Sequence, residues 1–426
     1  MKYLMRGAIV ASMLLITGCG SLDQPNNPKV EGGEMIVSST AKQILGGLLK
    51  NKVPGITKDT VLFGYQAYLI PYKTTDEEGN TVEVSGLMAV PTDIPEPIAA
   101  KVEAAGFAVV SDDHGTIFAN RDAPTVSNQM AGTPQGSALI LTALSGFVTL
   151  QPDYIGYGDS TDHYHPYMLK KSLANSTVDF IKAARVFAKN NSIKLNELLF
   201  VTGYSEGGYA AMATLEKIEK EGELHVAMAA PMAGPYALDY MALGVLKEPT
   251  IGVPSFMAEV GYAYSKAYGQ NITKVINEPY ASKLPELFSG DYNRTQIDPK
   301  LTHDTLGLFN ASFVADVFGP EHKGNPNNWF MQAISLNSVY RWAPQTPIAL
   351  VQCESDDVIP YALSEKAFEV MVKMGAKQIQ MVPVEKTIQK VNPDFPSLVG
   401  HGACGAPAYK VTAGIFAGMR KKVMGY

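Results

Sequence analysis

Short apolar runs alternate with amphipathic stretches along most of the chain. The apolar runs are four to six residues long, which is typical of strands that are buried on both faces. Stretches of helical composition separate them, and this spacing favours βαβ units and a mostly parallel sheet. The predicted strands are Phe107 to Ser111, Phe147 to Leu150, Leu198 to Thr202, Val226 to Ala230, Pro347 to Val351 and Ile379 to Val384; the predicted helices are Gln135 to Leu144, Asn175 to Ala188, Tyr209 to Glu221, Leu363 to Met374 and about Ala406 to Lys422.

Two further β-rich runs come early in the chain. Val61 to Tyr72 and Thr81 to Val90 flank the polar segment 76–80, whose sequence Asp-Glu-Glu-Gly-Asn is typical of a turn. We therefore expect a hairpin that precedes the alternating strands and helices.

One region interrupts the alternation. Between about Tyr236 and Ala343 the pattern predicts helices and loops but no clear strand, and Phe256, Val260 and Tyr264 recur at a helical spacing. The simplest arrangement is an α/β core over 36–235 and 344–426, with a helical cap over 236–343. Such insertions lie over the carboxyl ends of the strands, where ligands bind in open α/β sheets.

The first residues are expected to direct export. Lys2 and Arg6 precede an apolar run, Gly7 to Leu15, that is too short to cross a bilayer comfortably. Residues 16–19 read Ile-Thr-Gly-Cys, which resembles a bacterial lipobox and implies a signal peptide over 1–18 with a lipid on Cys19. The alternative is an ordinary cleaved signal with an incidental cysteine. Gly20 favours the outer membrane by the same resemblance, and 19–35 is interpreted as a flexible tether.

Composition excludes some partners. The 426 residues include 35 Lys and Arg against 41 Asp and Glu, so the formal net charge is −6, and no basic run stands out. An acidic surface repels phosphate backbones, which makes nucleic acid an improbable ligand. The hydrophobic fraction of 46% is that of an ordinary globular protein.

Residues 203–207 read Gly-Tyr-Ser-Glu-Gly and match the nucleophile elbow of α/β hydrolases. In that turn a strained backbone exposes the serine hydroxyl, and glycine is needed where a side chain would clash. A buried-strand run precedes the motif and a helix start rich in small residues follows it. This context predicts that Ser205 is a nucleophile, because the bare pattern can arise by chance in a chain with 38 glycines.

A serine nucleophile needs a base, and the base needs an orienting acid. In this fold the order along the chain is serine, acid, histidine. Asp356 follows the strand that ends at Val351 and stands four residues before Pro360, so it is the predicted acid, with Asp357 as the alternative. His401 follows the last predicted strand and is the predicted base.

Backbone N–H groups must also stabilise the oxyanion that forms during acyl transfer. The N–H of Glu206 is one candidate, because the elbow itself supplies it. The strand from Phe107 runs into His-Gly-Thr at 114–116, so the second donor is expected from Thr116 or Gly115; a simple turn is the alternative.

The glycine-rich segment 152–160 lacks the spacing of a phosphate-binding loop, so it does not predict a nucleotide site. His163 and His165 lie near Asp159 and Asp162, but hydrogen bonding explains loop residues of this kind better than a metal, and no metal site is predicted.

Several motifs together resemble the secretory-lipase family of α/β hydrolases, the fungal lipase A type and its bacterial relatives. They are Pro-Asp-Tyr-x-Gly-x-Gly-x-Ser with His-Pro-Tyr, Gly-Tyr-Ser-x-Gly-Gly, Asp-Asp-x-x-Pro-Tyr and His-Gly-x-Cys, and the likeness spans about Phe63 to Val423. The resemblance implies an α/β-hydrolase fold with a helical cap between strands six and seven. It also implies a triad of Ser205, Asp356 and His401, ester or lipid substrates, no cofactor, and structural roles for Asp153 and His165.

The expected activity is therefore hydrolysis of carboxylic esters through an acyl-enzyme at the cell surface or in the periplasm. Two alternatives remain: a peptidase with the same triad, for which Glu259 and Glu278 are the only candidate groups to bind a peptide terminus, and a binding protein without activity. The aromatic residues of the cap either line an acyl pocket or pack the cap onto the core. They are Phe256, Tyr262, Tyr264, Tyr268, Phe309, Phe313, Phe318, Trp329 and Phe330.

Cys353 and Cys404 lie three residues before Asp356 and three after His401. If the acid and the base are hydrogen-bonded, these cysteines are neighbours, and an exported protein permits their oxidation. The sequence favours a disulfide, with two buried free thiols as the alternative.

Overall fold

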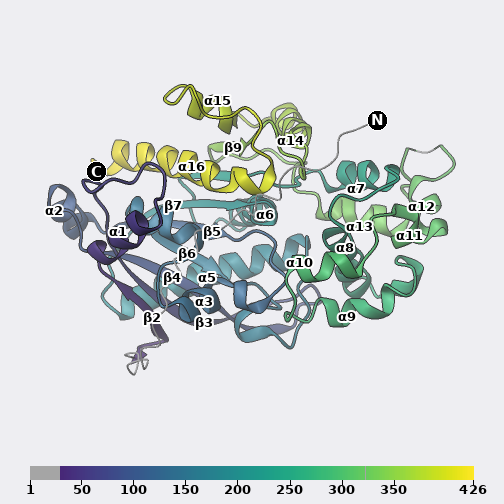
Figure 1. The fold of residues 1–426 in the computed structure, drawn as a ribbon, viewed down its shortest axis with the longest axis horizontal. Coiled ribbons are helices and arrows are strands. Elements are labelled where there is room, and N and C mark those ends of the chain that lie inside the picture. Colours follow the sequence, from purple (N-terminus) through teal and green to yellow (C-terminus); the bar gives the residue numbers. More distant parts are fainter. Residues whose placement is uncertain (1–28, 322) are drawn as a thin grey trace.

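One mixed sheet runs through the protein. The computed structural model describes residues 29–321 and 323–426, and within them the strand order is β1-β2-β3-β4-β6-β5-β7-β8-β9-β10 (Figure 1). Pairing is antiparallel from β1 to β6 and parallel from β6 to β10. The strands are β1 (Lys29–Val30), β2 (Gly33–Ser39), β3 (Gly64–Thr75), β4 (Thr81–Thr92), β5 (Phe107–Asp113), β6 (Val148–Pro152), β7 (Leu195–Tyr204), β8 (Met228–Met232), β9 (Ile348–Gln352) and β10 (Ile379–Pro383).

Two edge strands differ from the sequence prediction. Residues Lys29–Val30 and Gly33–Ser39 form β1 and β2, so the C-terminal part of the predicted tether over 19–35 is a hairpin paired to β3. The segment 29–39 has only three consecutive apolar residues, and its backbone hydrogen bonds are made with the distant strand β3. The local sequence pattern therefore does not indicate a strand. The predicted signal peptide, the lipidation site Cys19 and the rest of the tether up to residue 28 lie outside the described residues.

Helices cover both faces of the parallel part of the sheet. Val109 and Val201 pack in one apolar cluster with Phe180 of α5 (Lys170–Asn190). Their neighbours Val110 and Phe200 belong to a second cluster, which contains Phe416 of α16 (His401–Met424). Successive strand residues point to opposite faces, so α5 and α16 lie on opposite sides of the sheet (Figure 1). The core helices are α1 (Ala41–Lys50), α2 (Glu96–Ala105), α3 (Pro124–Ala131), α4 (Gly136–Ala138), a π-helix (Leu139–Leu144), α5 (Lys170–Asn190), α6 (Glu206–Glu221), α14 (Tyr361–Met374), α15 (Val384–Gln389) and α16 (His401–Met424).

The last helix begins earlier than predicted. The predicted start is near Ala406, but α16 begins at His401 and contains Pro407. The carboxylate of Asp357 accepts a hydrogen bond from the backbone N–H of His401 at 2.8 Å, and the disulfide at Cys404 holds the first turn. These tertiary contacts, which local pattern does not reveal, extend the helix to the site.

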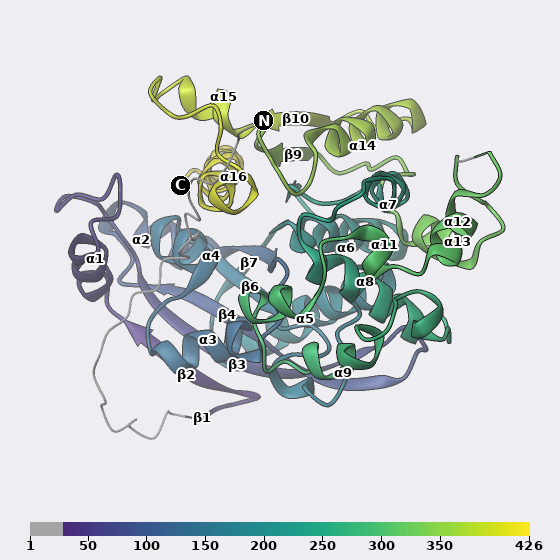
Figure 2. The same ribbon diagram turned by 45° about the vertical axis from the view of Figure 1, so that its right-hand side comes forward.

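The cap lies between β8 and β9, as a group of helices at one end of the molecule (Figure 2). Five of its aromatic residues pack on one another with ring centroids 5.3–6.5 Å apart, namely Tyr264, Tyr268, Phe313, Trp329 and Phe330. These rings therefore stabilise the cap itself. Its longer helices are α7 (Leu238–Lys247), α8 (Pro254–Ala267), α12 (Ala311–Phe318) and α13 (Trp329–Asn337), with single turns α9 (Leu284–Leu287), α10 (Arg294–Ile297) and α11 (Thr305–Leu308) between them.

The fold is that of an α/β hydrolase, as predicted: a mostly parallel central sheet flanked by helices. Within the two described ranges no helix combines the length and the apolarity that crossing a bilayer requires.

Candidate active site

Ser205 lies in the sharp turn between β7 and α6. Its backbone has φ 62° and ψ −121°, a left-handed conformation that costs free energy in a residue with a Cβ. The Ser205 N–H donates to the carbonyl oxygen of Met232 on the neighbouring strand β8 at 2.9 Å, which holds the turn in place. The serine hydroxyl is thereby presented at the carboxyl edge of the sheet.

Close backbone contacts explain the two glycines of the motif. A Cβ on Gly207 would lie 1.9 Å from the carbonyl oxygen of Asp113, and a Cβ on Gly203 would lie 2.5 Å from the same oxygen. No side chain fits at either position without moving β5 away from the turn. The glycines are therefore needed for the approach of β5, whose following loop carries Gly115 and Thr116.

His401 connects the serine to an acid. Its Nε2 lies 2.9 Å from Ser205 Oγ and its Nδ1 lies 2.8 Å from Asp356 Oδ2. The carboxylate can only accept a hydrogen bond, so Nδ1 carries the proton of the neutral imidazole and Nε2 is free to accept the serine proton. The side chains are well buried, with Asp356 fully covered and His401 10% exposed, so water competes little for these hydrogen bonds.

The two neighbouring aspartates have different partners. Asp356 Oδ1 accepts the backbone N–H groups of Val358 and Ile359 at 3.0 and 2.8 Å, which fixes its second oxygen toward the imidazole. Asp357 instead accepts the backbone N–H of His401 at the start of α16. The structure thus brings Asp356, the predicted acid, to the histidine ring and gives the alternative, Asp357, the role of a helix cap.

The predicted disulfide between Cys353 and Cys404 is present, with the Cα atoms 6.1 Å apart. Both cysteines are buried, and the bridge joins the loop that carries Asp356 to the helix that carries His401. Closing a loop of 51 residues stabilises the folded state by about 4 kcal/mol in the chain-entropy model. Because the bridge lies beside the acid and the base, it also limits their separation.

Two of the three predicted oxyanion residues, Glu206 and Gly115, lie next to the serine. Glu206 follows Ser205 and is the first residue of α6, so its N–H is free of the intrahelical ladder. A Cβ on Gly115 would lie 3.6 Å from the Cβ of Ser205, which places the backbone of that loop against the serine. Thr116 is next in the loop, and its hydroxyl lies 3.0 Å from the hydroxyl of Tyr167.

A buried pair that the sequence analysis did not predict lies behind the elbow. His165 Nδ1 lies 2.9 Å from the carbonyl oxygen of Ile155, and its Nε2 lies 2.7 Å from Glu206 Oε1. A carbonyl oxygen can only accept, so Nδ1 carries a proton and one further proton lies between Nε2 and the carboxylate. The pair is therefore neutral as a unit whichever atom holds that proton. His165 thus ties the side chain of Glu206, the residue after Ser205, to the loop after β6.

Further carboxyl groups are buried near the site. Burial raises the pKa of Asp112 and of Asp153 to about 6, although each accepts hydrogen bonds from neighbouring side chains. Burial and the nearby carboxylate of Glu206 raise the pKa of Glu259 well above its ordinary value. One oxygen of Glu259 has no hydrogen-bond partner within the described residues, which fits a neutral carboxyl group.

No group of three or more metal-binding side chains occurs in residues 29–321 and 323–426. His163 and His165 have separate partners, since His163 Nδ1 lies 2.9 Å from Asp162 while His165 binds Glu206. Asp153 accepts hydrogen bonds from Ser85 and Thr125 and so braces the loop, as the resemblance implied.

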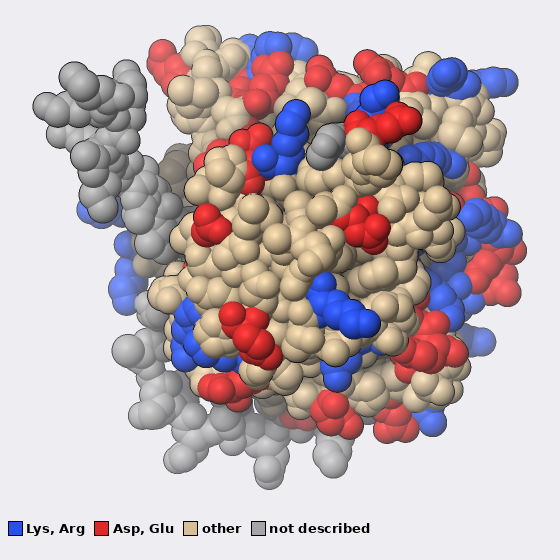
Figure 3. Space-filling model, turned by 90° about the vertical axis from the view of Figure 1, so that its right-hand side faces the viewer, with Lys and Arg blue, Asp and Glu red and all other residues tan. Residues whose placement is uncertain are grey.

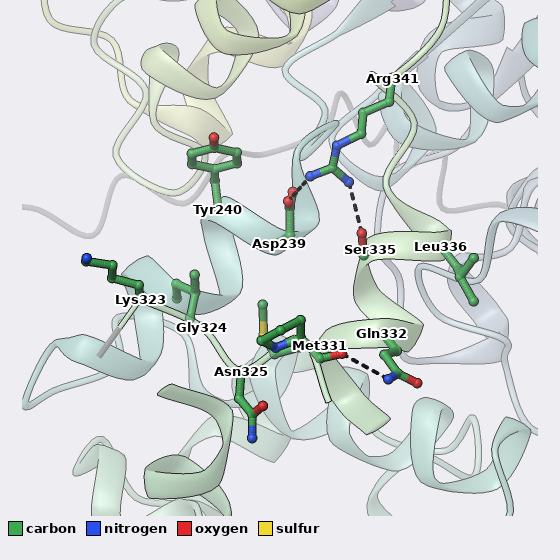
Figure 4. Close-up of a pocket in the computed structure, with 12 residues that line it drawn as sticks. Asp239, Tyr240, Lys323, Gly324, Asn325, Met331, Gln332, Ser335, Leu336 and Arg341 are labelled. Carbon is green, nitrogen blue, oxygen red and sulfur yellow. Dashed lines mark hydrogen bonds and ion pairs between the residues drawn. The ribbon is translucent and has the colours of Figure 1, made fainter. Parts of the chain in front are cut away.

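Residues of the cap line a cavity of about 640 Å³ (Figure 4). None of Ser205, Asp356 and His401 belongs to its lining. Asp239 and Tyr240 of α7 line it from one side, and Ser335 and Leu336 of α13 line it from another. Arg341 pairs with Asp239 and donates to Ser335 at 3.0 Å, so this arginine is committed to holding the two helices together (Figure 4).

Part of the chain matches a known family. The family model of the prolyl oligopeptidase family matches residues 135–267, which include the elbow. A search of curated proteins found no significant match.

Solved structures are similar over most of the chain. A Legionella pneumophila protein described as a hydrolase is 24% identical, with a TM-score of 0.76 over 91% of this chain and 97% of the other. The rice cell wall degrading esterase LipA from Xanthomonas oryzae is 23% identical, with a TM-score of 0.72 over 94% and 98%. Candida antarctica lipase A in its closed state is 13% identical, with a TM-score of 0.58 over 86% and 80%. At these identities the likeness shows the α/β-hydrolase fold.

The buried carboxyl groups predict an unusual pH dependence. The folded protein binds the Asp112 proton more tightly than the unfolded chain does, because its pKa rises from 3.8 to about 6. The contribution of this group to stability therefore falls as the pH rises from about 4 to about 6, by up to about 3 kcal/mol. Unfolding free energies of the wild type and Asp112→Asn, measured by denaturant at pH 4 and pH 7, test this. The wild type should lose stability relative to the variant as the pH rises; a difference that stays constant or grows in favour of the wild type contradicts it.

Proposed function

We propose that this protein of the α/β-hydrolase fold is a serine hydrolase that cleaves carboxylic esters through an acyl-enzyme. The observation that carries the proposal is the continuous hydrogen-bonded line from Ser205 Oγ through His401 to Asp356, with contacts of 2.9 and 2.8 Å. A line of this kind activates a hydroxyl that is otherwise a poor nucleophile at neutral pH.

In the proposed mechanism, His401 Nε2 takes the hydroxyl proton while Ser205 Oγ bonds to the ester carbonyl carbon. The negative charge moves to the carbonyl oxygen, where the N–H of Glu206 and an N–H of the loop at Gly115 and Thr116 stabilise it. The imidazolium then gives its proton to the alkoxide as the C–O bond breaks, which leaves an acyl-serine. Water repeats the same steps with His401 as base, and Asp356 holds the ring in the required tautomer throughout.

Ester substrates are favoured over peptides for two reasons. The similar structures include an esterase and a lipase, and the two acids that might have bound a peptide terminus are unsuited to it. Glu278 accepts hydrogen bonds from Ser282 at the surface. Glu259 is buried, and burial raises the pKa of its carboxyl group well above the ordinary value, which makes it a poor partner for an ammonium group. The partial match to the prolyl oligopeptidase family makes an amide substrate the second candidate.

A binding protein without activity would not require the strained backbone of Ser205 or the alignment of His401. Strain of this kind is retained when function depends on it. Both features therefore support catalysis over binding alone.

We also propose that the enzyme is exported and anchored by a lipid on Cys19 to the periplasmic side of a bacterial membrane, most simply the outer membrane. The support is the lipobox-like sequence at 16–19 together with the disulfide, which is typical of oxidising compartments.

Replacement of the nucleophile tests the activity. Ser205→Ala should reduce hydrolysis of short and long p-nitrophenyl esters to the roughly 10³–10⁴-fold acceleration that binding and oxyanion stabilisation retain. The wild type should cleave these esters far faster than aminoacyl anilides. Thermal unfolding of the variant provides the control for folding. Faster cleavage of anilides would establish the peptidase alternative, and full activity in the variant would mean a different nucleophile.

The two aspartates form a matched pair of variants. Asp356→Asn should lower kcat for an ester by about 10³–10⁴-fold, because the amide no longer favours a proton on His401 Nδ1. Asp357→Asn should cost far less, since the amide oxygen can still accept the backbone N–H of His401. Equal losses, or the reverse order, would contradict the assignment of Asp356 as the acid.

The proposed anchor is tested in cells. An alkyne fatty acid should label the wild type through Cys19, and Cys19→Ala should move the protein to the soluble fraction. A wild type that is soluble and carries no lipid label would show that the anchor is absent.

A further inference from the structure

Basic residues gather at the end of the molecule opposite the cap. Segments 41–60 and 401–426 together contain eight Lys or Arg and a single acid, Asp59, although the whole chain is acidic. Helix α1 and the C-terminal end of α16 lie at the same end of the molecule, beside α2 (Figures 1 and 2). Helix α2 adds Lys101 against Glu96 and Glu103, and Asp93 precedes this helix. We call the surface formed by 41–60, α2 and residues 410–426 the basic end.

The lysines of the basic end have no acidic partners within the part of the chain that the structure describes. Lysines elsewhere, such as Lys182, Lys217 and Lys386, form ion pairs at 2.5–2.6 Å. No such pair involves the exposed lysines of α1, of the loop after it or of the last turns of α16. Their charge is therefore available to an outside anion. These lysines are Lys42, Lys50, Lys52, Lys58, Lys410, Lys421 and Lys422.

An apolar groove lies among these charges. It has a volume of about 510 Å³, and Val61, Phe63, Ile98, Ile140 and Leu144 contribute to its walls. Lys410 of α16 is exposed and belongs to the same lining, so its charge is contiguous with the apolar surface. Arg420 also belongs to the lining, but it is buried and donates to the carbonyl oxygen of Gly146, so it is not part of the exposed charge. Val61 belongs to this lining and is 69% exposed, so an apolar side chain of the groove is accessible from outside.

We propose that the basic end is a docking surface for a bilayer that contains anionic phospholipid. Lysines around an apolar groove suit the surface of such a bilayer. The anionic headgroups attract the lysines, and the acyl chains beneath them accept the apolar side chains. The overall charge of −6 would otherwise repel the protein from an anionic membrane, so the local excess of lysine decides which end approaches. At physiological ionic strength only charges within about 8–10 Å of the surface are felt.

Docking by the basic end determines the orientation of the enzyme. The cap lies at the opposite end of the molecule, and its outer face carries acidic and basic residues side by side around an uncharged centre (Figure 3). The cap would therefore face the aqueous phase, and substrate would reach it from solution. The inference does not depend on ester hydrolysis or on a lipid at Cys19.

Flotation with vesicles tests the proposal. The protein is the soluble form of the full chain, which is the wild type if it is soluble and otherwise Cys19→Ala. It should float with vesicles of phosphatidylglycerol and phosphatidylcholine, should not float with pure phosphatidylcholine, and should be released by added salt. Changing Lys42, Lys50, Lys52 and Lys422 all to Gln should weaken binding by between about tenfold and several hundredfold, because each lysine that lies near an anionic surface contributes up to roughly fivefold.

The matched control changes four exposed lysines outside the basic end to Gln, namely Lys247, Lys274, Lys283 and Lys373. This control should bind the anionic vesicles as the parent does, and thermal unfolding should show that both variants are folded. Val61→Asp should weaken binding through the apolar groove. Absence of binding to anionic vesicles, or equal loss in the control and the test variant, would overturn the proposal.

Discussion

The position of the His401 ring is the constraint on which the site depends. Its two nitrogens must reach Ser205 and Asp356 at the same time, and these residues come from three segments far apart in the chain. The strained turn at Ser205 fixes one side, and two backbone N–H groups fix Asp356 on the other. The ring itself is held at the first residue of α16 by the helix cap from Asp357. A shift of any one of these supports would lengthen a hydrogen bond that proton transfer needs.

The same supports explain features that otherwise look costly. Glycine at 203 and 207 weakens local structure, yet only glycine lets β5 approach the elbow. Buried carboxyl groups such as Asp112 and Asp153 cost desolvation energy, but their hydrogen bonds tie β5 and the loop after β6 to neighbouring elements. The pair of His165 and Glu206 then connects that loop to the helix that begins at the nucleophile. These features lower the stability of the fold, but they position the residues of the site.

Much of this architecture could be predicted from the sequence. The buried parallel strands and the cap stand out, because continuous apolar runs differ from amphipathic helices over many residues. Ser205, Asp356 and His401 each follow a predicted strand, so the sequence alone predicts that they lie at one edge of the sheet. The disulfide followed from the same proximity, since its cysteines stand three residues from the acid and the base.

The remainder depends on contacts between distant segments. Strand β2 has only three consecutive apolar residues and gains its backbone partners from β3. The first residue of α16, His401, is held by the distant carboxylate of Asp357. The hydrogen bond between His165 and Glu206 could not be predicted from either segment alone. Both residues stand in recognised motifs, but nothing in those motifs indicates that their side chains meet. Pattern identifies elements well, whereas it does not identify which polar groups meet in the interior.

The central claim is that the line of hydrogen bonds makes Ser205 the reactive nucleophile. Treatment of the folded protein with a fluorophosphonate, followed by mass spectrometry of its peptides, tests this directly. The account predicts one phosphonylated serine, Ser205, with labelling abolished by prior denaturation and strongly slowed in His401→Ala. Labelling of another serine, or labelling of Ser205 that is unaffected by loss of His401, would contradict it.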